Sequence, residues 1–218
     1  MSQAMDSIDV VVDLLKNNPE IAALGFNTYK PRPARQTCGQ LEELRETIFH
    51  HVPNDQLLIP RSSLDREGIL RLCAELSPGS RLALRSEIQV SGAPKFIPMI
   101  DFICEKSEAN LRLLSSQLGH LHRIDGFNTG GGVLLETDNS YHYQARRLLP
   151  LDKWTSFIGH VLLLHPPAEH RELAHRTGAL SVIDVRWAGH VLIGGGGALR
   201  ISQNFDGKFP RVVKQVAA

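Results

Sequence analysis

The sequence predicts an α+β protein, because helical and strand-like patterns follow one another along the chain without a regular βαβ repeat. Apolar residues recur at helical spacing over residues 6–17. Residues 81–90 instead alternate apolar and polar side chains, which is the pattern of a half-buried strand. Residues 96–105 form an apolar strand-like run with one carboxylate, Asp101, in its middle. Helices and strands are therefore expected to mix in one fold.

The composition is that of an ordinary globular protein. Of the 218 residues, 42% are hydrophobic and 22% are charged, so the chain can bury a sizeable core. The net charge of +1 excludes nucleic-acid binding driven by a global basic field, and any such binding must depend on a local patch. Three widely spaced cysteines, a polar N-terminus and the lack of an apolar run of about 20 residues predict a cytoplasmic protein without a membrane partner.

No Pro/Ser-rich linker divides the chain, so we expect one composite domain over residues 1–218. Residues 1–78 are predicted to be mainly helical, and residues 80–205 to carry the sheet. The predicted helices are 6–17, 40–52, 62–76, 107–118, 151–164 and 168–177. The predicted strands are 81–90, 96–105, 133–136, 139–146, 181–187 and 198–204. Residues 27–39 are expected as an irregular loop, and the basic tail at 205–218 as an edge strand or short extension.

Local signals place several helix starts and turns. A side-chain oxygen can accept from the free N–H groups of a first helical turn, so polar residues before a helix predict its N-cap. The predicted caps are Asp6 or Ser7, Ser62 or Ser63, and Ser107. Two loops predict hairpin turns between strands: residues 91–94 and the glycine run 194–197.

Asp101 is the residue around which the predicted site is built. In an extended strand it would share a face with Ile97, Met99 and Ile103. A carboxylate in so apolar a strand must pair with a cation, bind a metal or face a cleft, because burying it alone costs too much free energy.

Two later strands repeat this arrangement of polar groups at every second position. They are residues 139–146, with Ser140, His142 and Gln144 on one face, and residues 181–187, with Asp184 and Arg186 on one face. If both strands neighbour the Asp101 strand in a sheet, their ionisable side chains converge in one site. The alternative is a set of unrelated, half-buried polar residues.

The order of these residues resembles the catalytic core of the archaeo-eukaryotic primase superfamily. Its members carry an hhhDhD/E motif, an sxH motif, an hD motif and a downstream basic strand. The matching positions are Asp101, Ser140 with His142, Asp184, and residues 200–204. The resemblance covers about residues 80–205. It implies a primase-like core with a mixed or antiparallel sheet, an RRM-like half and a helical N-terminal part.

The resemblance also implies roles for individual residues. Asp101 and Asp184 would be the catalytic ligands of Mg²⁺ or Mn²⁺, with Glu105 as a third candidate ligand. The residues expected to contact a nucleoside triphosphate are Ser140, His142, Arg186, Arg200, Ser202 and Asn204. Metal ions neutralise charge on a reacting phosphoryl group, and imidazole and guanidinium groups donate to phosphate oxygens. The implied activity is primase- or polymerase-like nucleotidyl transfer with a DNA or RNA strand as partner.

The sequence departs from the family pattern at position 103. The family has a second acid there, and this chain has Ile103. Glu105 lies on the same strand face two residues further on, and Glu136 and Asp138 are more remote substitutes. Two alternatives to an active nucleotidyltransferase therefore stay open. One is a catalytically degenerate primase-like module that binds nucleotide or nucleic acid, and the other is a scaffold or interaction protein in a larger assembly.

Overall fold

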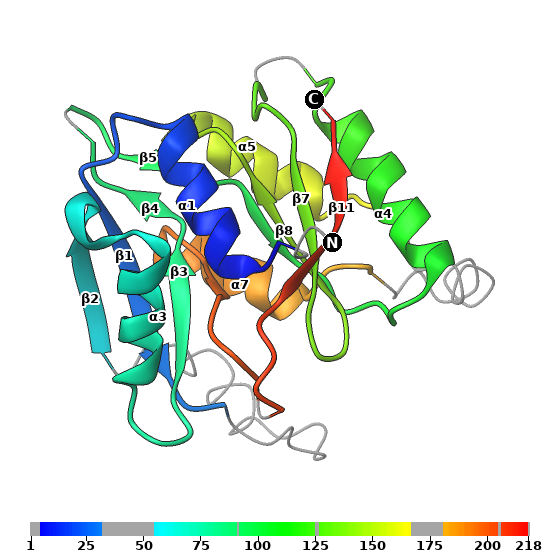
Figure 1. Ribbon diagram of the computed structural model, residues 1–218. Coiled ribbons are helices and arrows are strands. Elements are labelled where there is room, and N and C mark those ends of the chain that lie inside the picture. Colours follow the sequence, from blue (N-terminus) through cyan, green and yellow to red (C-terminus); the bar gives the residue numbers. More distant parts are fainter. Residues whose placement is uncertain are drawn as a thin grey trace, which may run out of the picture.

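A computed structural model describes residues 5–31, 55–90, 92–124, 127–166, 181–204 and 206–217. Two four-stranded sheets and a small three-stranded ribbon form the centre of this structure, and helices cover them from opposite sides (Figure 1). All strand pairs are antiparallel. The mixture of helices and antiparallel sheets agrees with the predicted α+β class. None of the helices in the described ranges combines the length and apolar character needed to cross a lipid bilayer.

The first sheet, which we call the N-terminal sheet, joins segments from both ends of the chain. Its strands are β1 (Ala23–Tyr29), β2 (Asp55–Pro60), β3 (Arg81–Arg85) and β10 (Ala198–Arg200), in the order β10-β3-β1-β2. Helices α1 (Ser7–Asn17) and α3 (Arg66–Ala74) cover one face of it, and a short 3-10 helix (Arg61–Ser63) follows β2. Ile8 and Leu14 of α1 share a buried core with Phe26 and Leu82 of the sheet.

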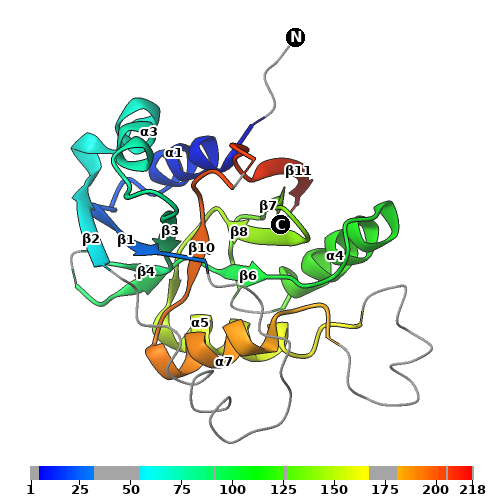
Figure 2. The same cartoon turned by 90° about the horizontal axis from the view of Figure 1, so that it is seen from below.

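The second sheet, which we call the central sheet, carries most of the predicted site. Its strands are β6 (Met99–Asp101), β7 (Gly132–Glu136), β8 (Tyr141–Ala145) and β11 (Arg211–Val216), in the order β11-β7-β8-β6. Helices α4 (Glu108–Leu121) and α5 (Leu151–Val161) pack on one face around Tyr143 and Phe157. Helix α7 (Val185–Gly194) lies beside α5, on the side of the molecule opposite α1 and α3 (Figure 2). The basic tail forms the edge strand β11, as predicted.

The helix caps agree with the sequence at two of three positions. Asp6 accepts from the N–H groups of Ile8 and Asp9 and caps α1, and Ser107 caps α4. The predicted start of the third helix at Ser62 or Ser63 is wrong. Those serines belong to the 3-10 helix, and α3 begins at Arg66 because the carboxylate of Asp65 accepts from Gly68 N–H at 2.7 Å.

The N-terminal part contains two strands that the sequence does not predict. β1 reaches Tyr29, so the predicted loop at 27–39 is wrong over its first three residues. β1 is buried on both faces from Leu24 to Phe26, where the side chain of Arg85 lies across Gly25. A strand covered on both sides lacks the alternation of apolar and polar residues that identifies a half-buried strand. The predicted helices at 40–52 and 168–177 lie outside the described residues.

The two long strands predicted at 81–90 and 96–105 are each broken into two. The chain bends at Ser86 between β3 and β4 (Glu87–Ile88), and again between β5 (Lys95–Phe96) and β6. Ser86 fixes the first bend, since its hydroxyl accepts from Gly197 N–H and its carbonyl accepts from Ile97 N–H, each at 2.8 Å. β4 and β5 form the predicted hairpin, which β9 (Leu149–Pro150) extends into the ribbon, whereas β3 pairs with β1 and β10.

The predicted strand at 181–187 is wrong after Asp184. Ile183 forms a β-bridge with Phe102, but helix α7 begins at Val185 and places Arg186 on a helix. The glycine run is not a hairpin turn. It ends α7, with Gly195 in the left-handed conformation at φ 67°, and leads directly into β10.

Candidate functional site

Asp101 and His142 lie opposite one another on adjacent strands. The register of β6 and β8 pairs the two residues, and Asp101 Oδ1 lies 3.4 Å from His142 Nε2. The side chain of His142 is largely buried, while that of Asp101 is partly exposed. The structure therefore brings together the first two of the predicted site residues.

Asp184 lies on the other side of Asp101. Its backbone N–H donates to the carbonyl of Asp101 at 3.0 Å, and Ile103 N–H donates to the carbonyl of Val182 at 2.8 Å. The segment before α7 thus runs along the outer side of β6. Asp101 is flanked by His142 on one side and Asp184 on the other, as the sequence predicts.

The carboxylate of Asp184 is already engaged in holding α7. Its Oδ1 accepts from the backbone N–H groups of Arg186 at 2.9 Å and Trp187 at 3.1 Å, which makes Asp184 the N-cap of the helix. Its Oδ2 lies 3.7 Å from the guanidinium of Arg186, whose side chain is mostly exposed. One carboxylate oxygen is therefore used by the fold, and the other faces a surface arginine.

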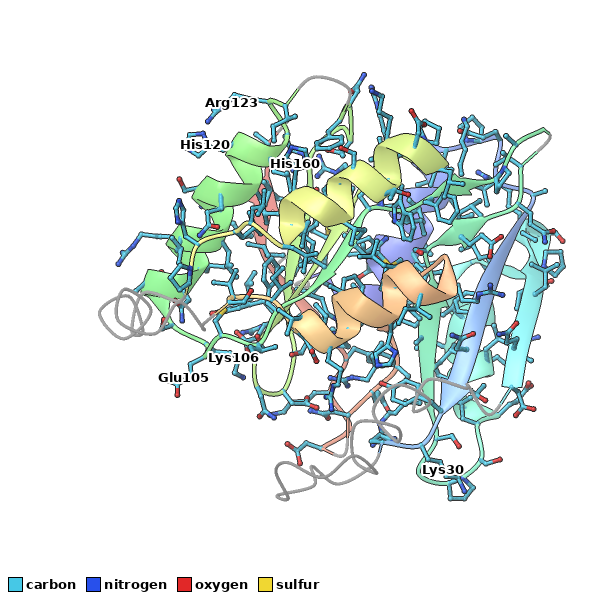
Figure 3. All side chains as sticks on the ribbon, turned by 180° about the vertical axis from the view of Figure 1, so that it is seen from behind. Lys30, Glu105, Lys106, His120, Arg123 and His160 are labelled. Carbon is cyan, nitrogen blue, oxygen red and sulfur yellow. The ribbon has the colours of Figure 1, made fainter. Side chains whose placement is uncertain are left out.

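Ile103 occupies the open face that it shares with Asp101. Ile100 and Phe102 point into the core, while Asp101 is partly exposed and Ile103 is 57% exposed. Glu105 follows a bend and does not take the place of the missing acid, since it points outward from this edge of the molecule beside Lys106 (Figure 3).

Ser140 is the polar residue of the site that lacks a partner. It is only 8% exposed, and its hydroxyl has no hydrogen-bond partner among the described residues. The side-chain N–H₂ of Gln144, on the same strand face as His142, is also buried without such a partner. Buried polar atoms are nearly always hydrogen-bonded, so each of these two atoms is an exception at which a partner is missing among the described residues.

Arg200 reaches this region from the N-terminal sheet, because β10 lies beside β6 (Figure 2). The side chain of Arg200 is 11% exposed, and its guanidinium donates to Asp138 Oδ2 and to the carbonyl of Ser202, each at 3.2 Å. Burial raises the pKa of the Tyr29 hydroxyl, and the charges of Arg200 and Asp101 act on that same hydroxyl in opposite directions. Arg200 and Asp101 therefore face one region from two sheets.

The two remaining predicted ligand contacts are occupied within the protein. The hydroxyl of Ser202 accepts from the backbone N–H of Leu82 at 2.9 Å and is buried. The side-chain amide of Asn204 donates to Asp138 Oδ1 at 2.5 Å, and its side-chain Oδ1 accepts from the backbone N–H groups of Asp206 and Lys208. Both side chains hold the segment after β10 in place.

Asp138 and Tyr29 are the residues of this region whose positions sequence reasoning did not foresee. Asp138 appears in the sequence only as a remote substitute for the missing acid, yet its carboxylate binds Arg200 and Asn204. The sequence did not indicate that Tyr29 lies near the site, because it does not predict the strand β1 to which Tyr29 belongs. Glu136, the other remote substitute, pairs with Lys106 and Arg211 instead.

A metal ion requires several ligand atoms that converge on one point. No group of three His, Cys, Asp or Glu side chains within the described ranges is arranged to hold an ion. Asp101 and Asp184 are nevertheless neighbours through a backbone hydrogen bond, and Mg²⁺ is usually bound by one or two carboxylates together with waters and substrate phosphates. The residues present fit one ion that shares its ligands with a phosphate. They do not fit a pair of ions, because Ile103 offers no ligand.

Comparison with known proteins supports the likeness seen in the motifs. A family model described as archaeo-eukaryotic primase 1D-like matches residues 60–213, which is more than half of the chain and includes the whole site. No curated protein and no solved structure shows significant similarity to the chain. On the strength of the family match, the chain belongs to the archaeo-eukaryotic primase 1D-like family.

Proposed function

We propose that this primase-like domain binds the triphosphate of a nucleoside triphosphate at the site formed by Asp101, His142, Asp184 and Arg200. The observation that carries the proposal is the buried hydroxyl of Ser140, two residues before His142, which has no hydrogen-bond partner among the described residues. A buried hydroxyl without a partner costs about 1–3 kcal/mol, and a phosphate oxygen of a ligand supplies the missing partner.

The surrounding groups suit a phosphate chain. His142 and Arg200 approach from two different sheets and offer N–H donors to phosphate oxygens. Hydrogen bonds between a charged donor and a phosphate are about twice as strong as neutral ones. The guanidinium of Arg200 uses one N–H on Asp138 and one on Ser202, so further N–H groups remain for a ligand.

A divalent ion is the second part of this proposal. Asp101 and Asp184 would hold one Mg²⁺ or Mn²⁺ that binds together with the triphosphate, and the ion would neutralise phosphate charge. Asp184 would contribute the oxygen that does not cap α7. In the absence of nucleotide, the two carboxylates alone would bind the ion weakly.

Nucleotidyl transfer onto a DNA or RNA strand is the second candidate function. It is favoured by the backbone hydrogen bond between Asp184 and Asp101, which keeps two acidic residues next to one another. It is opposed by Ile103, because a two-metal transfer needs carboxylate ligands for both ions. Binding of nucleotide with little or no transfer is therefore the function that the site supports best.

The experiment is a titration of the purified protein with labelled ATP and GTP, with and without Mn²⁺. Metal-dependent binding by the wild type and its loss in Ser140→Ala would support the proposal. Primer synthesis or extension on a single-stranded template would support the second candidate. A wild-type protein that binds neither nucleotide with Mn²⁺ present would contradict both functions.

A further inference from the structure

The turn between β7 and β8 connects the two sheets at the candidate site. Thr137 N–H donates to the carbonyl of Ser140 at 2.9 Å, and the Thr137 hydroxyl accepts from Ser140 N–H at 3.3 Å, which closes the turn. Asp138 lies at the tip of this turn. Its carboxylate points away from the central sheet and contacts Arg200, which ends β10 of the N-terminal sheet.

Both oxygens of the Asp138 carboxylate have partners. Oδ2 lies 3.2 Å from Arg200 Nη2, and Oδ1 accepts from the side-chain amide of Asn204 at 2.5 Å. The side chain of Asn204 is itself fixed, because its Oδ1 accepts from two backbone N–H groups at 2.8 and 2.9 Å. With both oxygens in use, Asp138 is better placed to orient Arg200 than to replace the acid missing at position 103.

The contact contributes little to folding by itself. The side chain of Asp138 is 43% exposed, and ion pairs with so exposed a partner stabilise proteins by only about 0–1 kcal/mol. The side chain of Arg200, in contrast, is 11% exposed, and its guanidinium contacts both Asp138 and the carbonyl of Ser202. Loss of Asp138 therefore frees the guanidinium to rotate without unfolding the domain.

We propose that Asp138 is a positioning residue of the triphosphate site, which holds the guanidinium of Arg200 in a fixed orientation toward the side of the site lined by Asp101 and His142. This inference rests on the proposed function and adds a specificity to it. A fixed guanidinium presents a planar set of N–H groups, so it distinguishes ligands by the positions of their phosphate oxygens. Asp138 therefore favours ligands that carry the distal phosphates over ligands with one phosphate.

The test compares ATP and AMP binding in the presence of Mn²⁺ for the wild type, Asp138→Ala, Arg200→Ala and the double variant. We expect Asp138→Ala to lower ATP affinity about tenfold and AMP affinity less than about twofold, a change that corresponds to one lost charge-assisted contact. In the double variant, Asp138→Ala should add nothing to the loss caused by Arg200→Ala. Asp138→Asn keeps an oxygen toward Arg200 and should recover part of the affinity.

Asp13→Ala is the matched control. The side chain of Asp13 is 42% exposed and lies 3.9 Å from Arg146. The substitution therefore removes a similar surface ion pair at another place and should leave the affinities for ATP and AMP unchanged. A ligand-free readout is the NMR signal of the Arg200 Nε–H, which should shift and narrow in Asp138→Ala as the guanidinium gains freedom.

The outcomes separate the two proposals. A wild type that binds no ATP contradicts the proposed function and this inference with it. A wild type that binds ATP, together with an Asp138→Ala variant that binds it equally well, overturns the positioning role alone. An equal loss for ATP and AMP, or a loss that persists in the Arg200→Ala background, also overturns it.

Discussion

The backbone N–H of Asp184 donates to the carbonyl of Asp101 at 3.0 Å, so two acids that lie far apart in the sequence are held side by side. Asp101 ends a strand of the central sheet, and Asp184 begins helix α7. A hydrogen bond between main chains does not depend on the protonation of either carboxyl. The pair therefore keeps its spacing whether or not a ligand neutralises its charge.

Ser140→Ala should lower nucleotide affinity without loss of stability. The hydroxyl is buried without a partner among the described residues, so its removal should not destabilise the domain and should raise the free energy of unfolding by up to about 1–3 kcal/mol. Ser202→Ala is the matched control, because that buried hydroxyl accepts from Leu82 N–H and its removal should cost about 1–3 kcal/mol. Chemical denaturation and ATP titration of both variants measure these effects. A large loss of stability in Ser140→Ala would argue against a free hydroxyl.

The buried histidine at the end of α4 should make the domain less stable in acid. His122 contacts the hydroxyls of Thr129 and Tyr143, and burial lowers its pKa from 6.5 to about 4. The unfolded chain then binds more protons than the folded protein between about pH 6.5 and pH 4, so stability falls as the pH falls through this range. One pKa unit corresponds to about 1.4 kcal/mol, so the loss at pH 4 should approach 3 kcal/mol.

The measurement for His122 is urea denaturation at several pH values between 4 and 7. His122→Gln should reduce the slope of stability against pH in this range, since glutamine has no proton to gain. His160→Gln is the control. His160 lies on α5 and is only partly buried (Figure 3), and its replacement tests whether the loss of an imidazole elsewhere changes the slope. An unaltered slope in His122→Gln would rule out His122 as the cause.

Gly132→Ala should weaken the β7–β8 pair that positions His142. A Cβ atom at this residue would lie 2.5 Å from the carbonyl of Gln144 and from the ring of Tyr143, and neither can move freely. We expect the free energy of unfolding to fall by about 1–3 kcal/mol or more. Thermal unfolding measures this loss. Gly119→Ala is the control, because nothing lies within 4 Å of its Cβ and alanine in a helix gains up to about 1 kcal/mol. Equal melting temperatures for the two variants would contradict the close contact at Gly132.

The sequence predicts that Asp101, His142 and Asp184 converge only if their segments are neighbours, and the structure places the three residues side by side. Each residue sits in a short segment whose side chains alternate, and the period of two is a local property that a single sequence displays. The sequence does not predict the start of α7, because residues 182–187 alternate like a strand. In the structure the side chain of Asp184 caps a helix that begins at Val185. As a result Arg186 was expected on the site face and lies on α7 instead.

Contacts between the two sheets could not be predicted in the same way. Arg200 belongs to β10 of the N-terminal sheet, whereas Asp138 belongs to the turn before β8 of the central sheet. Their pairing depends on how the sheets meet, which no local pattern encodes. β1 was also missed, since a strand buried on both faces carries no alternation.

A comparison of Asp184→Asn with Asp184→Ala should separate the helix-capping role of Asp184 from its role as a metal ligand. Asparagine is as good an N-cap as aspartate, so Asp184→Asn should unfold like the wild type, whereas Asp184→Ala should lose about 1 kcal/mol from α7. Both variants lack the charge that an ion requires, so both should lose most of the Mn²⁺ dependence of nucleotide binding. Asp65→Ala removes the cap of α3 away from the site and should lower stability while the Mn²⁺ dependence stays intact. Titration with ATP at several Mn²⁺ concentrations measures the Mn²⁺ dependence of each variant. Wild-type Mn²⁺ dependence in Asp184→Asn would show that Asp184 caps α7 but does not bind the ion.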